Sequence, residues 1–366
     1  MRKLLAIAIA MIFAACSSDD SETTNQYYPK GIVLKSQAEV DAFVALGLTE
    51  LNEELSIGFI GLGATDITSL AGLKHLKKAN RIDITGNPNL KDLAGLENLQ
   101  KVDTLLINNN SSLKDLKGLR QLSDIMVLGI YSNNALTDLQ GLEGITALDQ
   151  LDITHNNNLN TLHGINNIVT INILNILLND KLLSLEGIDS LTYIKNIFIQ
   201  GGVLSSLQLL ANVNITETIA IMNSQLVNLS GLENITTLKY LRLSSNDYLE
   251  SLSGLDNLDT VNTLHVTQNK KLTSISSLAS LTKIEGTGEY YFDLHINSNN
   301  ALQSLDGLQN ATAGFSRIVI SNNTLLNDFC ALKNMVANSN SINLTISENP
   351  FNPTIEDIKS GNCSLN

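Results

Sequence analysis

The chain has 366 residues, of which 43% are hydrophobic, 16% are charged and 4% are aromatic. This composition excludes intrinsic disorder, because enough apolar residues are present to fill a core. The net charge of −13 falls to −15 when Arg2 and Lys3 are removed with the leader described next. Such an acidic chain repels phosphate, so we exclude nucleic acid as a partner and attribute the charge to solubility.

Residues 1–15 have the pattern of an export signal. Met1-Arg2-Lys3 is a short basic start, and the apolar run from Leu4 to Ala15 follows it. This run is too short to cross a hydrocarbon core of about 30 Å as a helix, which argues against a permanent transmembrane anchor. It ends in Phe13-Ala14-Ala15-Cys16, with small residues just before a cysteine.

This junction resembles the lipobox of bacterial lipoproteins, and the resemblance implies that Cys16 carries a lipid that anchors the protein to a membrane. Residues 16–30 then form a tether. Its acidic run Ser17–Glu22 resembles the surface-export signals of lipoproteins in Bacteroidetes-type bacteria, and a plain flexible linker is the alternative. Because Ser17 and not Asp follows the cysteine, the inner-membrane retention rule known from other lipoproteins is not triggered, and we expect an outer-membrane protein. The resemblance of the acidic run to surface-export signals favours an orientation that faces the cell exterior. A periplasmic orientation is the alternative.

Residues 31–60 are expected to cap the domain that follows. Ser36-Gln37-Ala38-Glu39 has the form of a capping box, and Val40, Phe43, Val44 and Leu46 follow at helical spacing. We predict a short helix that covers the first coil, although its apolar stripe also fits a partner surface. Leu55–Phe59 is predicted as the first strand.

Residues 61–350 contain an internal repeat. A short L-x-G-L signature recurs with a usual spacing of 23 residues, which is typical of stacked coils. The residue after each anchor is Leu or Ile, as expected for a position that points into the core. The twelve anchors are Gly72, Gly95, Gly118, Gly141, Gly164, Gly187, Leu209, Gly231, Gly254, Ser277, Gly307 and Ala331.

Each coil also contains two apolar residues separated by one position, such as Leu105 and Ile107. This period of two predicts a strand with one buried face, so successive coils should build one long parallel sheet. Three residues after the strand, ten of the twelve coils have an asparagine whose amide can satisfy buried backbone groups. We predict an inward asparagine ladder, distorted at Gly202 and Ser224. Its members are Asn87, Asn110, Asn133, Asn156, Asn179, Asn246, Asn269, Asn299, Asn323 and Asn349.

Coils of the form Leu136-x-x-Leu139-x-Gly141-Leu142 resemble leucine-rich repeats, and among these the receptor L-domain type. The resemblance covers roughly residues 31 to 350. It implies an α/β-type repeat solenoid that is mainly β, with right-handed coils, about twelve repeats and one long parallel sheet. It does not identify a ligand, because one fold serves many functions.

Two features modify the end of the solenoid. Between Leu281 and Leu294 one coil has about seven extra residues, including Tyr290 and Tyr291, and this insertion is either part of a binding edge or a tolerated surface loop. Residues 351–366 form the predicted C-terminal cap, with a helical turn from Ile355 to Lys359. Cys330 and Cys363 are expected to form a disulfide that closes it; a reactive thiol pair is the alternative.

The sequence contains no catalytic motif, and we therefore predict that the protein is not an enzyme and holds no cofactor. His265 and His295 occupy equivalent outward positions on consecutive strands, with Asp293 on the same face. A metal site needs three or four such ligands, so we predict none.

Outward positions of the middle strands favour a binding surface instead. They carry an apolar band that suggests contact with a protein or a glycan, unless flanking loops cover it or the residues are isolated. Its members are Leu106, Val127, Tyr131, Ile173, Leu177, Phe198, Met222 and Tyr240. We predict that Leu106, Tyr131, Phe198 and Tyr240 bind ligand, together with Tyr290 and Tyr291. The predicted function is surface recognition or adhesion, and a structural envelope scaffold facing the periplasm is the alternative.

Overall fold

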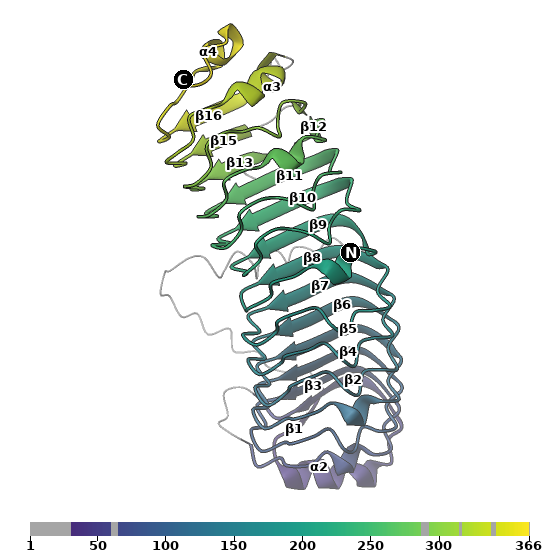
Figure 1. Ribbon diagram of the computed structural model, residues 1–366. Helices are drawn as coiled ribbons and strands as arrows, with labels where there is room; N and C mark the ends of the chain where they lie inside the picture. Colours follow the sequence, from purple (N-terminus) through teal and green to yellow (C-terminus); the bar gives the residue numbers. More distant parts are fainter. Residues whose placement is uncertain (1–30, 60–64, 287–292, 315–316, 338–341, 366) are drawn as a thin grey trace.

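The computed structural model describes residues 31–59, 65–286, 293–314, 317–337 and 342–365. These residues wind into one solenoid of about 13 turns, with its strands along one side (Figure 1). The strands pair in parallel with those of neighbouring coils, in the order β1 to β11 and then β13, β15 and β16. The predicted mainly β solenoid with a repeat of about 23 residues and one long parallel sheet is confirmed.

Strands of eight or nine residues form the central part of the sheet, and shorter strands form its two ends. An insertion interrupts the strand region after β11, where β12 pairs with β11 and β14. The strands are β1 (Ile32–Leu34), β2 (Glu50–Ile57), β3 (Lys78–Thr85), β4 (Lys101–Asn108), β5 (Asp124–Tyr131), β6 (Ala147–Thr154), β7 (Thr170–Leu177), β8 (Tyr193–Gln200), β9 (Asn214–Met222), β10 (Thr237–Ser244), β11 (Thr260–Thr267), β12 (Lys283–Ile284), β13 (Leu294–Asn297), β14 (Thr312–Ala313), β15 (Arg317–Ser321) and β16 (Asn343–Ser347).

The core is a stack of aliphatic side chains inside the solenoid. The Leu or Ile after every anchor is at most 2% exposed, and strand residues such as Leu105 and Ile107 are fully buried. Each such burial stabilises the fold by about 1.5 to 3 kcal/mol relative to exposure. Because a side chain on one coil packs against the equivalent side chain on the next, the repeat needs its neighbours for stability.

The asparagine ladder is confirmed. All ten predicted asparagines are buried, and each donates from Nδ2 to a strand carbonyl of the preceding coil, as Asn156 does to Ile130 at 2.9 Å. The Oδ1 of Asn156 accepts from the backbone N–H of Asn133. At Gly202 the ladder residue has no side chain, and the hydroxyl of Ser224 bonds forward to Asn246. The distortion was therefore predicted at the correct two coils.

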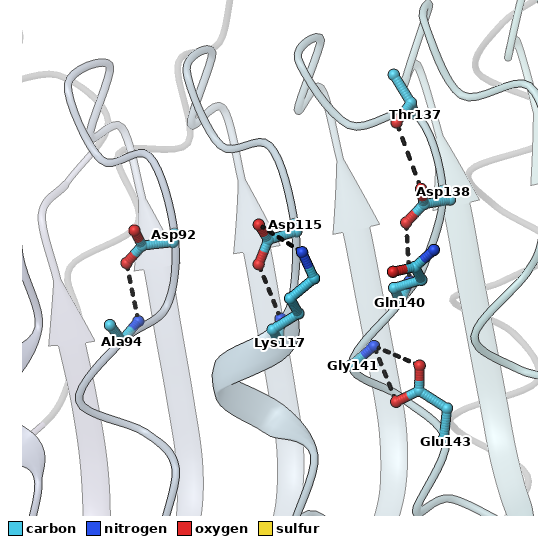
Figure 2. A network of polar contacts seen from close by, with 9 residues as sticks. All are labelled: Asp92, Ala94, Asp115, Lys117, Thr137, Asp138, Gln140, Gly141 and Glu143. Carbon is cyan, nitrogen blue, oxygen red and sulfur yellow. Dashed lines mark hydrogen bonds and ion pairs between the residues drawn. The ribbon is translucent and has the colours of Figure 1, made fainter.

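The turns at the anchors are of two kinds. In seven coils the anchor is a glycine with φ between +107° and +117°, and in five coils it lies within a short 3₁₀ helix. In six of the glycine turns a side chain two residues later accepts from the anchor N–H, as Glu143 does from Gly141 (Figure 2). The 3₁₀ helices are η2 (Ala71–Leu73), η3 (Lys117–Leu119), η4 (Gln208–Leu210), η5 (Ser276–Leu278) and η6 (Cys330–Leu332).

Every coil also has an Asp, Asn, Ser or Thr just before its anchor turn. The side-chain oxygen of this residue accepts from the backbone N–H two positions later, as Asp92, Asp115 and Asp138 do (Figure 2). Such side chains hold turns in place by satisfying backbone donors. Asp92, Asp115 and Asp138 therefore stabilise the turns before the anchors.

The N-terminal cap differs from the prediction in three respects. Helix α2 (Gln37–Phe43) has Ser36 as its N-cap, but the Glu39 carboxylate accepts from Lys35 N–H at 2.5 Å. The chain continues as η1 (Val44–Leu46), whose Leu46 is 58% exposed and not part of the buried stripe. Residues 55–59 are also not the first strand, because β1 precedes them and pairs with the end of β2. The sequence did not predict β1, because its apolar run of three residues is too short to show the alternation of buried and exposed positions that marks a strand.

The C-terminal cap is built as predicted, with one additional helix. Thr354 forms a capping box with Asp357 at the start of α4 (Ile355–Ser360). Cys330 and Cys363 form the predicted disulfide, which closes the end of the solenoid across 33 residues. Helix α3 (Lys333–Ala337) was not predicted.

Candidate functional site

The strand residues that point away from the core form the open face of the sheet. Its central row follows the register of the strands and contains one residue from each coil. A second row lies two residues earlier on each strand, so it lies on the same face. The central row is Ser56, Asp83, Leu106, Gly129, Asp152, Asn175, Phe198, Ala220, Arg242, His265, His295, Val319 and Thr345.

The open face is more polar than the predicted apolar band. Leu106 and Tyr131 are half-buried, whereas Phe198, Met222 and Tyr240 are only 6 to 7% exposed. In the central row, Gly129, Asp152 and Asn175 separate Leu106 from Phe198, so the apolar side chains do not form one continuous exposed strip. The prediction overlooked this because it considered only the apolar outward positions.

Six buried side-chain polar atoms lack a hydrogen-bond partner in the part of the chain that the structure describes, and all six belong to the open face. Three come from the central row and three from the row before it. Leaving a buried polar atom unpaired costs about 1 to 3 kcal/mol, so folding alone does not favour this arrangement. The atoms are Ser56 Oγ, Asp83 Oδ1, Asn175 Oδ1, Asn196 Nδ2, Thr263 Oγ1 and Asp293 Oδ1.

At the N-terminal end, a charged cluster spans β2 and β3. The Arg81 guanidinium lies 3.1 Å from Asp83 Oδ2 and 3.4 Å from Glu54 Oε1. Burial raises the pKa of Asp83 to about 6, the positive charge of Arg81 opposes this rise, and the nearby Glu54 carboxylate adds to it. Ser56 lies beside Asp83 in register.

In the middle of the face, Asp152 is the centre of a hydrogen-bond network. It accepts from the Tyr131 hydroxyl at 2.5 Å, from Gln150 Nε2 at 2.9 and 3.1 Å, and from Asn175 Nδ2 at 2.5 Å. Burial and the Asp152 charge together raise the pKa of Tyr131, so its hydroxyl stays protonated and donates. Tyr131 is thus a predicted site residue whose polar end is held by the face itself.

Towards the C-terminal end, the structure places His265 beside His295 as predicted, with ring centroids 5.7 Å apart. The Tyr240 hydroxyl is 3.1 Å from His265 Nδ1. Burial, and then the charges of His265 and Arg242, lower the pKa of His295 to about 4. Asp293 is 1% exposed and accepts from the backbone N–H of Arg317. The described residues contain no group of three or more His, Cys, Asp or Glu placed to hold a metal ion.

Tyr290, Tyr291 and Cys16 all lie outside the described residues. Within the described ranges, none of the helices has the length and apolar character needed to span a bilayer.

No known family model matches the chain, and no curated protein sequence matches it. Among solved structures, an internalin of Listeria monocytogenes is 19% identical over 97% of this chain and 92% of its own, with a TM-score of 0.39. A leucine-rich-repeat protein of Leptospira interrogans is 16% identical over 96% and 90%, with a TM-score of 0.42. The functional domain of InlJ from Listeria monocytogenes is 17% identical over 81% and 75%, with a TM-score of 0.23.

The structure itself shows a parallel-sheet solenoid whose coils of about 23 residues are filled with leucine and isoleucine. The similarity to the three solved structures is too low to transfer a ligand from any of them. The function must therefore be argued from the open face.

Proposed function

We propose that this protein is a non-catalytic recognition module that binds a protein or glycan through the open face of its sheet. The supporting observation is that all six unpartnered buried polar atoms of the described residues gather on this one face. A ligand that docks on this face and displaces the side chains around these atoms lets them form hydrogen bonds that the folded chain leaves unmade. Solenoids present such long surfaces to partners.

We further propose that the protein is a lipoprotein of the outer membrane, anchored through Cys16 and displayed on the cell surface. The basic start, the apolar run and the small residues before Cys16 support export and lipidation. The acidic segment after Cys16 supports surface display. Protease treatment of intact cells tests the orientation, with a periplasmic marker to verify that the outer membrane is closed. Digestion supports surface display, and protection favours the periplasmic scaffold.

Binding is tested with the purified full-length chain on an array of glycans and a library of secreted and surface proteins. The variant Ile173→Glu/Leu177→Glu places charge on half-buried positions of β7. Leu183→Glu, on the loop after β7 where Leu183 is 61% exposed, is the matched control. We expect the β7 variant to lose binding and the control to retain it. Equal binding by both variants would place the site elsewhere, and no binding by the wild-type protein would refute recognition.

A further inference from the structure

The open face changes from acidic to basic residues along the solenoid. In its central row, Arg242, His265 and His295 follow one another in register on β10, β11 and β13. The central row of the N-terminal half contains Asp83 and Asp152 instead. Because neighbouring strands are about 4.8 Å apart, the three basic side chains start within about 10 Å of one another. A chain with a net charge of −13 thus has a basic stretch on its open face.

The Arg242 guanidinium is open to solvent and lacks an acidic partner. Its side chain is half-buried, and among the described residues it forms no ion pair and no hydrogen bond. None of the six enclosed polar atoms without a partner belongs to it, so a ligand can reach its nitrogen atoms. Burial lowers the pKa of His295 most, and the charges of His265 and of Arg242, two strands away, lower it further. The charge of Arg242 is therefore not neutralised locally.

The carboxylates near Arg242 do not compensate its charge. Glu217, at the edge of the sheet on β9, lies 3.6 Å from Lys195 Nζ and 2.6 Å from Lys239 Nζ, so two lysines already neutralise it. Asp293 belongs to the open face but is only 1% exposed. An anionic group that approaches Arg242 from the solvent therefore meets an unpaired cation.

Hydroxyl and amide groups lie beside Arg242 on the open face. Two residues after the central row, Ser244, Thr267 and Asn297 are adjacent in register, and Thr267 and Asn297 are half-buried. The hydroxyls of Ser244 and Thr267 are 2.8 Å apart, and Asn297 Nδ2 donates to Ser321 Oγ at 3.0 Å. These side chains thus form a polar row whose groups can both donate and accept.

We propose that this part of the open face binds a carboxylated glycan, with a sugar carboxylate paired to the Arg242 guanidinium. This inference rests on the proposed recognition function and names its ligand class. A planar guanidinium binds a carboxylate through two parallel hydrogen bonds. The ring of a uronic acid has one carboxylate and several hydroxyls, so it fits a single arginine beside a polar row. A neutral sugar leaves Arg242 without a counter-ion.

An acidic peptide fits this surface less well than an acidic glycan does. Protein interfaces are centred on large apolar or aromatic side chains that fill pockets. Tyr240, on the same strand as Arg242, is only 7% exposed and so offers no such anchor. The accessible groups beside Arg242 are polar instead, as in Thr267 and Asn297. A chain of carboxylated sugars binds through groups of this kind.

The net negative charge of the protein does not prevent this contact. At physiological ionic strength the Debye length is about 8 Å, so carboxylates on the other faces of the coils are largely screened. A nucleic acid meets stronger repulsion, because a duplex has one charge per about 1.7 Å, whereas a polyuronate has one per sugar ring. β7 is three coils from β10, about 14 Å, so a glycan of several rings on Arg242 also reaches β7.

The test is isothermal titration calorimetry of the purified full-length chain with three polyuronates: polygalacturonate, alginate and hyaluronate. Arg242→Gln removes the charge and Arg242→Lys keeps it. Arg120→Gln is the matched control, because Arg120 is an exposed arginine at the end of η3, outside the strands. We expect at least one polyuronate to bind, with Kd raised about tenfold or more by Arg242→Gln, raised less by Arg242→Lys and unchanged by the control. The methyl ester of the same polymer, which is neutral, should not bind measurably.

Binding that survives Arg242→Gln, or that falls equally in Arg120→Gln, overturns the proposal. If Arg242→Gln has a lower melting temperature, the wild-type protein decides, because equal binding of the free acid and its methyl ester also overturns the proposal. Poly-L-glutamate is the peptide probe, and binding of this probe without any polyuronate would show that the glycan assignment is wrong. If no polyanion binds, the Arg242 site is wrong, and the array with the β7 variant still decides the proposed recognition function.

Discussion

Backbone strain is concentrated at one residue in each coil. Ten non-glycine residues have φ between +53° and +59°, and each directly precedes a position of the ladder. This left-handed conformation lets the chain turn out of the strand, but it costs an L-residue on the order of 1 kcal/mol. Asn, Ser and Gln occupy most of these positions. His155, Glu348 and Leu178 occupy the other three, and Leu178 is the one with a bulky apolar side chain, at φ +56°.

Replacing Leu178 with glycine should therefore stabilise the protein. Glycine adopts this conformation without steric cost, and the gain should exceed the loss of the half-buried side chain. We expect Leu178→Gly to raise the free energy of unfolding by about 0.5 kcal/mol, measured by urea denaturation. Leu183→Gly, at an exposed leucine without positive φ, should lower it or leave it unchanged. A lower stability of Leu178→Gly would show that the side chain outweighs the strain.

We also predict that Asp83 makes the stability of the protein depend on pH. Its pKa in the folded protein is raised to about 6 from 3.8. The folded state then binds more protons than the unfolded state between these values, so ionisation of Asp83 destabilises the fold as pH rises through this window. Asp83→Asn removes the titration. We expect the stability of the variant relative to wild type to be greater at pH 7.5 than at pH 3.5, by about 1 kcal/mol or more after solvent screening.

Urea denaturation of both proteins at the two pH values measures this difference directly. Asp124→Asn is a suitable control, because this exposed aspartate pairs with Lys101 on the surface. Its relative stability should not rise between pH 3.5 and pH 7.5. A pH-independent effect of Asp83→Asn would mean that the carboxyl titrates normally in the fold.

The ladder joins successive coils outside the sheet, together with backbone hydrogen bonds between their turns. The Asn156 side chain donates to the carbonyls of Ile130 and Thr154, and it accepts from the N–H of Asn133. Asn156→Leu leaves these buried groups unpaired, so we expect a loss of about 3 kcal/mol or more in unfolding free energy. Asn157→Leu is the control, since Asn157 is the exposed neighbour and should change stability little. Thermal denaturation compares the two, and equal melting temperatures would contradict the role given to the ladder.

Most of the repeat structure could be predicted from the sequence. The strands, the ladder and its gap follow from apolar period and asparagine spacing, because core positions allow few residue types. The two kinds of anchor turn were missed although their signal is present. Glu, Asp, Asn or Gln stands two residues after each of the seven glycine anchors with positive φ, and Lys, Arg or Ala after the other five. An acceptor there can bond the N–H that a positive-φ glycine presents.

The open face was harder to predict because its polar residues act through neighbours on other coils. Asn175 looks like an ordinary exposed amide in the sequence, and only the register with β6 and β8 shows that Asp152 orients it. Tyr240 likewise contacts His265 on the next strand, and Phe198 lies between Asn175 and Ala220 of the neighbouring strands in register. The insertion around Tyr290 has no counterpart in the other coils, so the repeat pattern does not predict its structure.

For the whole molecule, the gap in the ladder marks the weakest junction between coils. A solenoid is stabilised mainly by contacts between neighbouring coils, so opening should begin where one class of contact is missing. At Gly202 and Ser224 two consecutive coils lack the asparagine, and Gly201 and Gly202 both have positive φ. We infer that the solenoid opens at the two junctions that join β7, β8 and β9 before it opens elsewhere.

Ser224→Asn should close part of this gap. Asn223 has the positive φ that precedes a normal ladder residue, so an amide at 224 can reach the carbonyl of Ile199, the residue equivalent to those bonded in other coils. We expect slower hydrogen exchange of the backbone amides of β8 and β9, measured by mass spectrometry, with the ends of the solenoid unchanged. Ser205→Asn, at an exposed position in the same coil, should have no effect. If exchange at β8 and β9 is already as slow as at β5 and β6 in the wild-type protein, the junction is not weak, and the sheet alone holds the two halves together.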